Sequence, residues 1–143
     1  MIDNQKGYTL MELLVVIAIF GIISSFLIIN SSGLIESYRL RLNANQVFSI
    51  AHKSRSFAVS NSNNYTLEIS SSELAIYQEG KIEAIEVFDL YPGISASHSR
   101  SDDKTIFYPL GTASPGTITI SNTRGSSYSV VVASVGRIRI EKN

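Results

Sequence analysis

An unbroken apolar run near the amino terminus limits what this chain can fold into more than any other feature. The run extends from Leu13 to Ile29, seventeen residues without a charge, which is roughly 26 Å of α-helix. Adding the flank from Tyr8 gives twenty-two residues whose only charged side chain is Glu12. A helix that is apolar on every face needs an apolar surround, which the rest of so short a chain can scarcely supply. We therefore predict a membrane-anchoring helix over residues 8–30 rather than a buried core helix.

The polar segment ahead of this run has the reverse order of an ordinary secretory signal. Residues 1–7 read MIDNQKG, and no small-residue cleavage site follows the apolar run. Removal of residues 1–7 as a leader would leave the apolar helix attached to the rest of the chain. Lys6 is offset by Asp3, so the charge bias gives only slight support for a cytoplasmic amino terminus.

The segment that follows the anchor has the spacing of an amphipathic helix. Over residues 31–60 the apolar side chains recur at steps of three and four, at Leu40, Ala44, Val47, Phe48, Ala51 and Ala58. No proline occurs before Pro92, so the two helical segments could form one continuous rod. The polar run 60–64, SNSNN, is typical of a turn that ends the helix.

Beyond residue 64 the apolar period changes to two, which indicates strands. They are predicted at 65–69, 74–77, 82–88, 105–108, 117–120, 128–133 and 135–140. The polar stretch 95–103 is predicted to be a flexible loop, and Glu79-Gly80-Lys81 a hairpin turn. The predicted fold class is therefore α+β, in which a long amino-terminal helix packs on a small antiparallel β head that comprises residues 61–143.

Composition excludes some classes of site and leaves others open. There is no cysteine, so neither a disulfide framework nor a thiolate site can form. Twelve basic residues balance twelve acidic ones, which gives no overall case for a nucleic-acid partner. Residues 68–103 contain eight acidic side chains and two basic ones, whereas residues 104–143 contain five basic side chains and one acidic one. We expect a head that is acidic in its first part and basic in its last.

Residues 6–12 read KGYTLME and lead directly into the apolar run. This motif resembles the signature of type IV pilins and type II secretion pseudopilins, although that family more often has Phe where Tyr8 stands. The resemblance implies that a prepilin peptidase cleaves between Gly7 and Tyr8 and methylates the new amino terminus. It also implies a single-pass protein of the inner membrane with its head in the periplasm, later assembled into a periplasmic pseudopilus or a surface pilus.

Glu12 has a physical interpretation that does not depend on the resemblance. A carboxylate in a membrane anchor costs roughly 2.5–3.5 kcal/mol at mid-bilayer and less near the edge, so it usually marks function. Cleavage after Gly7 would create an ammonium four residues before Glu12, on the same helical face. The resemblance implies that Glu12 meets the amino terminus of a neighbouring subunit during assembly. The alternative is that Glu12 merely lies among the lipid headgroups.

The last third of the chain resembles one branch of this family. The segments FYPLG at 107–111, GTITI at 116–120 and VVVASVGRIR at 130–139 have the order and spacing of the GspH/FimT branch. This implies a minor subunit near a filament tip, with two small antiparallel sheets packed on the helix. The implied partners are other pilins or pseudopilins, the prepilin peptidase, an inner-membrane assembly platform and, before assembly, membrane lipid. The motifs do not separate a secretion machine from a pilus machine.

Arg137 and Arg139 would project from one face of a strand, while the apolar residues between them face the other. Some FimT-type pilins resemble this pattern and bind DNA through such arginines, which makes DNA uptake an alternative function. Arg124 and Lys142 are candidates to enlarge that patch. The plainer interpretation, which we favour, is a solvent face whose charges discourage edge-to-edge pairing.

No pattern in the sequence indicates catalysis. His52 and His98 have no neighbours at ligand spacing, and Asp102-Asp103 lacks the oxygen-rich loop of a calcium site. There is no pairing of a nucleophile with a base. We therefore predict a structural subunit that is not an enzyme and has no cofactor or metal. A single-pass membrane protein with an uncleaved anchor is the further alternative, and it would keep Met1.

Overall fold

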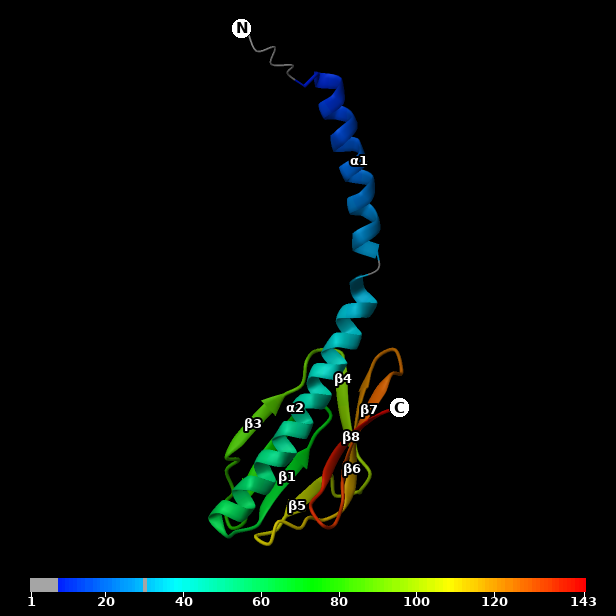
Figure 1. The fold of residues 1–143 in the computed structure, drawn as a ribbon. Helices are drawn as coiled ribbons and strands as arrows, with labels where there is room; N and C mark the ends of the chain where they lie inside the picture. The colour runs from blue at the N-terminus through cyan, green and yellow to red at the C-terminus, as the bar shows by residue number, and fades with distance from the viewer. Residues whose placement is uncertain (1–7, 30) are drawn as a thin grey trace. The chain divides into compact units, whose positions relative to one another are not determined.

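The computed structural model describes residues 8–29 and 31–143 (Figure 1). The chain divides into two compact units between Ile35 and Glu36. The elements are α1 (Leu10–Ile29), α2 (Ser31–Asn61), β1 (Tyr65–Ile69), β2 (Glu73–Gln78), β3 (Glu86–Asp89), β4 (Ile94–His98), β5 (Lys104–Phe107), β6 (Gly116–Asn122), β7 (Ser127–Val132) and β8 (Ile138–Lys142). The predicted leader 1–7, with the cleavage residue Gly7, lies outside the described residues, and so does Asn30.

Helix α1 is apolar around its whole circumference. Glu12 is its only charged residue, and the side chains from Leu10 to Ser25 are exposed. Such a helix needs lipid or other apolar helices around it. Within residues 8–29 and 31–143, no helix reaches the length and hydropathy expected of a bilayer-crossing segment. The assignment of residues 8–30 to a membrane or a filament core stays a prediction.

Helix α2 has the amphipathic character predicted for residues 31–60. Its buried side chains recur at helical spacing, at Leu40, Asn43, Ala44, Val47, Ile50, Ala51, Ser54 and Ala58. Half of these are alanine or serine, and small side chains let the helix backbone approach the sheets closely. The helix ends at Asn61, and Ser62 follows in the left-handed conformation with a φ of 50°, a common way to end a helix.

The described strands form two antiparallel sheets, which confirms the predicted architecture. The strand order is β3-β2-β1-β5 in the first sheet and β4-β6-β7-β8 in the second. Alternate residues are buried, such as Tyr65, Leu67 and Ile69 in β1 and Ile118 and Ile120 in β6. These side chains join the buried side of α2 in one hydrophobic core. Helix α2 and both sheets therefore share a single core.

Three predicted boundaries in the head are wrong. The stretch 95–103, predicted to be a loop, begins with most of β4, where Ile94 and Ala96 are buried and pair with β6. The serines of β4 hid its period of two, because they have little tendency of their own to form strands. Strand β3 begins at Glu86 instead of residue 82. The strand predicted at 135–140 begins at Ile138, because Gly136, with a φ of 77°, lies in the preceding turn.

The inner edges of the two sheets meet at a seam between β4 and β5. His98 Nε2 of β4 lies 3.0 Å from Thr105 Oγ1 of β5. Ser114 satisfies the free edge of β5, since its N–H donates to Ile106 O and its Oγ accepts the Ile106 N–H, both at 2.8 Å. The outer edges are β3 and β8, which lie on opposite sides of α2 in Figure 1.

Candidate functional site

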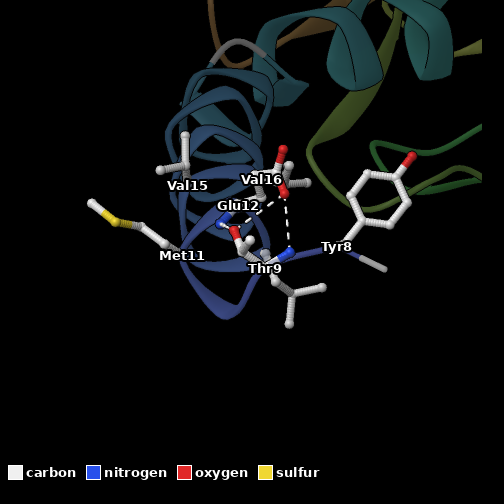
Figure 2. A pocket seen from close by; sticks show the side chains of 7 residues that line it. Tyr8, Thr9, Met11, Glu12, Val15 and Val16 are labelled. Atoms are coloured by element: carbon white, nitrogen blue, oxygen red, sulfur yellow. Dashed lines mark hydrogen bonds between the residues drawn. The ribbon is translucent and has the colours of Figure 1, made fainter. Parts of the chain in front are cut away.

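The amino-terminal motif forms a hydrogen-bonded turn at the start of α1 (Figure 2). The Thr9 N–H donates to Glu12 Oε2 at 3.0 Å, and the Thr9 hydroxyl donates to the same oxygen at 3.1 Å. In return, the Glu12 N–H donates to Thr9 Oγ1 at 3.2 Å. The Leu13 N–H then donates to Thr9 O at 3.2 Å and continues the helix. Thr9 and Glu12 therefore form a capping box, with Thr9 as the N-cap residue.

The role of Thr9 was not predicted from the sequence. A signal was present, because Ser or Thr followed three residues later by Glu, ahead of an apolar run, is the signature of a capping box. Such a cap contributes about 0.5–2 kcal/mol to a helix, and a carboxylate in the first turn also interacts favourably with the helix dipole. Glu12 thus has a task in its own chain as well as the predicted one between chains.

The surroundings of Glu12 are apolar and exposed. The residues that line the surface hollow at this end of α1 are Tyr8, Thr9, Met11, Glu12, Leu13, Val15 and Val16. Tyr8 is 90% exposed, and its ring points away from the Glu12 carboxylate (Figure 2). Both bonds from Thr9 end on Oε2, so the cap does not use Oε1. A further cation could approach this carboxylate without breaking the cap.

Two of the predicted basic residues lie close together at the start of β8. Arg137 precedes the strand and Arg139 lies in it, and both are exposed, while Ile138 between them is buried. The predicted alternation therefore holds at Ile138, whereas Ile140, which was predicted to pack beside it, is exposed. Arg139 Nε lies 2.8 Å from Glu141 Oε1 on the same side of the strand. Both side chains of this ion pair are half exposed, so water screens their attraction.

The other two basic residues lie towards the opposite end of the second sheet. Arg124 is in the turn between β6 and β7, where its Nε is 2.5 Å from Glu36 Oε2 of α2. Lys142 ends β8 and lies opposite Tyr128 of β7. The four basic residues therefore spread along the length of β8 and do not form one cluster.

The residues considered as metal ligands from the sequence were His52, His98 and Asp102-Asp103. In the described part of the chain, no group of three or more His, Asp or Glu side chains is placed to hold a metal ion. His98 Nδ1 instead accepts the Arg100 N–H at 3.1 Å. Burial lowers the pKa of His98 below 6.5, and attraction to the Asp102 carboxylate opposes that shift. These contacts belong to the seam between the sheets.

Two family models match the sequence. The prokaryotic N-terminal methylation motif matches residues 2–28. The model of the type II transport protein GspH matches residues 43–136, from the middle of α2 to the turn before β8. A search of curated proteins found no match.

Several solved structures have the same fold. The type IV minor pilin FimU of Pseudomonas aeruginosa aligns with a TM-score of 0.63 and 20% identity, over 74% of this chain and 90% of FimU. The minor pseudopilin EpsH of the Vibrio cholerae type 2 secretion system aligns with a TM-score of 0.61 and 11% identity, over 73% of this chain and 97% of EpsH. GspH of E. coli aligns with a TM-score of 0.55 and 13% identity, over 73% and 89%. At such low identities the likeness shows the fold alone.

Proposed function

Because this chain belongs to the type II transport protein GspH family and carries the prokaryotic N-terminal methylation motif, we propose that it is a minor pilin or pseudopilin subunit of a filament. A prepilin peptidase cleaves it between Gly7 and Tyr8 and methylates Tyr8. The mature subunit is assembled at or near the tip of a type II secretion pseudopilus or a type IV pilus. The observation that carries the proposal is a single carboxylate, fixed by a capping box, at the start of an otherwise apolar helix.

The exposed apolar surface of α1 supports the proposed location. Before assembly the chain is a single-pass protein of the inner membrane with its head in the periplasm, and lipid surrounds α1. An assembly platform in that membrane then extracts the subunit. In the filament the apolar helices of neighbouring pilins or pseudopilins replace the lipid, so the apolar side chains are never left in water.

The geometry at Glu12 supports a role for charge in aligning each subunit with the next one in the filament. Cleavage after Gly7 produces an ammonium at Tyr8, and a carboxylate that is already oriented loses little further freedom when it binds that cation. An uncleaved chain has a neutral peptide bond at this place and offers no such charge. In an apolar surround the pair is strong, because few waters compete for either partner. The Glu12 carboxylate of one subunit thus binds the Tyr8 amine of the next.

Two substitutions of Glu12 separate this role from the cap. Glu12→Gln keeps a side-chain oxygen that can accept the Thr9 N–H, whereas Glu12→Ala removes both the cap and the charge. We expect both variants to reach the membrane and to be cleaved, yet both to be incorporated into filaments far less than the unsubstituted chain. Quantitative immunoblotting of sheared filaments against total membrane protein measures this incorporation.

Normal incorporation of the Glu12→Gln variant would contradict the charge-based account. If only Glu12→Ala were impaired, the carboxylate would serve the helix start alone. Loss of membrane insertion or cleavage in both variants would also contradict it, because the defect would then precede assembly.

Capture of DNA during natural transformation is a second candidate function. Its support is the exposure of Arg137 and Arg139 at the start of β8. The pairing of Arg139 with Glu141 and of Arg124 with Glu36 weakens it, because these carboxylates offset charge that would otherwise attract phosphate. Binding that falls steeply with salt and is lost in the Arg137→Ala/Arg139→Ala variant would favour it.

A further inference from the structure

The head has two open sheet edges. At the seam, hydrogen bonds from Ser114 to β5 and from Ala96 of β4 to Ser71 O occupy the inner edges, whereas no strand in residues 31–143 pairs with the outer edge of β3 or of β8. The Ala133 N–H bonds to Arg137 O and the Asn143 N–H bonds to Ser127 O. By the alternation of an antiparallel pair, Ile138, Ile140 and Lys142 therefore direct their backbone groups outward.

The outer edge of β3 has the same character. The Leu90 N–H bonds to Ser72 O, so alternation leaves the backbone groups of Val87 and Asp89 directed away from β2. Val87 is 55% exposed, and Ile140 on β8 is 36% exposed. Each edge thus combines free backbone donors and acceptors with an exposed β-branched side chain, which suits strand pairing.

The two edges differ in the sign of their charge. Residues 82–89 contain Glu83, Glu86 and Asp89 and no basic side chain, whereas residues 137–142 contain Arg137, Arg139 and Lys142 and only one acid. Glu86 is bound by Lys53, and Arg139 is bound by Glu141. Among the described residues, two carboxylates at β3 and two cations at β8 have no ion-pair partner, namely Glu83, Asp89, Arg137 and Lys142.

We propose that β3 of one head pairs with β8 of a second copy of this chain, so that the sheets of adjacent heads join edge to edge. Like charges oppose pairing of β3 with β3 and of β8 with β8, whereas opposite charges favour β3 with β8. The charges on each edge therefore oppose pairing with the same edge of another copy and favour pairing with the other edge. The contact joins two different surfaces of the head, so it leaves one edge free on each partner and can repeat from copy to copy.

This inference rests on the proposed function. Both strands are short, so the pairing is weak until the heads are held side by side, as they are when α1 is confined to a membrane or a filament. It also deepens that function, because it predicts adjacent copies of this chain instead of a solitary one.

Disulfide cross-linking tests the contact cleanly, because the chain contains no cysteine. Figure 1 draws β3 and β8 running in the same direction, so heads anchored in one membrane pair these strands in parallel, and Val87 then shares a face of the joined sheet with Glu141. The full chain is expressed in its membrane with Val87→Cys and Glu141→Cys together, and the cells are treated with a mild oxidant. We expect a ladder of dimers, trimers and longer species. Either substitution alone should remain monomeric, and a mixture of the two single variants should stop at the dimer. The matched control replaces Glu141→Cys with Ser49→Cys, an exposed position on α2, and should give several-fold less product.

Charge reversal sharpens the assignment. Glu83→Lys with Asp89→Lys on the Val87→Cys chain should lower the dimer yield several-fold. Arg137→Glu with Lys142→Glu on the Glu141→Cys chain should then restore it.

The inference is overturned if no ladder forms, if Val87→Cys dimerises with itself, or if the control cross-links equally well. It is also overturned if Val87→Cys is captured by a protein of different mass instead of by its own copy. Filament incorporation and the amino-terminal mass are measured in the same samples. Normal values of both without a ladder would refute the edge contact and leave the proposed function standing.

Discussion

Both ring nitrogens of His98 are engaged at the seam. Nδ1 accepts the Arg100 N–H, so the neutral ring carries its proton on Nε2 and can donate it to Thr105 Oγ1, whose residue is fully buried. Gly116 makes room for this arrangement, because a Cβ there would lie 2.6 Å from Nε2. The charged groups facing His98 are Arg100, Asp102 and Asp103. Burial of the ring disfavours a second proton more than the two carboxylates favour it, so protonation opposes the folded state.

We predict that the free energy of unfolding falls as the pH drops below about 6.5 and stops falling below the pKa of His98 in the folded protein. The sign follows from the lowered pKa, since the unfolded chain binds the proton more readily than the folded one. Urea titrations of the full chain in detergent, followed by circular dichroism at pH 7.5 and pH 5, measure this change. His98→Gln should reduce the pH dependence.

An unchanged pH dependence in His98→Gln would contradict this assignment. Asp102 provides an internal check, because its bond with Arg100 lowers the pKa of that carboxyl below 3.8. Its stabilising contribution is lost only in more acidic solution, so the two effects fall in separate pH ranges.

At the scale of elements, the turn between β7 and β8 crosses the loop between β5 and β6. Gly136, with a φ of 77°, lies against Gly111, and a Cβ at Gly136 would be 1.8 Å from Gly111 O. The same oxygen accepts the Arg55 Nε–H of α2 at 2.8 Å. The Gly111 carbonyl is thus bonded to α2 and packed against the turn, and the turn can approach it only because residue 136 has no side chain.

Gly136→Ala should destabilise the head strongly. Gly125 supplies the matched control, since its φ is 83° and a Cβ there would meet nothing within 4 Å. We expect Gly125→Ala to cost about 1–2 kcal/mol of unfolding free energy, from backbone strain alone. Gly136→Ala should cost about 1–3 kcal/mol more, because the packed loop must move. Denaturant titration of both variants measures the difference, and equal losses would show that the close approach is unimportant.

The elements with a regular apolar spacing within their own segment could be predicted from the sequence. Those defined by contacts with distant segments could not. Helix α2 and strand β1 follow from apolar periods of 3.6 and 2 that are visible within each segment. Strand β4 was missed, because serines alternate with its buried residues and only its pairing with β6 reveals it. The contact of Gly136 with Gly111 joins loops far apart in the chain, so no local pattern could indicate it.

At the scale of the whole molecule, the predicted charge polarity follows the division into sheets in part, because Lys104, predicted to lie in the basic part, belongs to β5 of the first sheet. The first sheet and its connections contain most of the acidic residues. In the second sheet, the basic residues that have no ion-pair partner among the described residues are Arg137 and Lys142, both at β8. Composition predicted this asymmetry, but which edges remain open depends on the strand order. The candidate processing residues were predicted from one short motif, whereas the cap between Thr9 and Glu12 became evident only with the helix start.

The central claim is that the chain is a filament subunit that becomes competent when its leader is removed. Mass spectrometry of the chain recovered from purified filaments tests this most directly. The account predicts an amino-terminal peptide that begins with N-methylated Tyr8 and contains no trace of residues 1–7. Recovery of the chain with Met1 intact, in membranes and never in filaments, would contradict it.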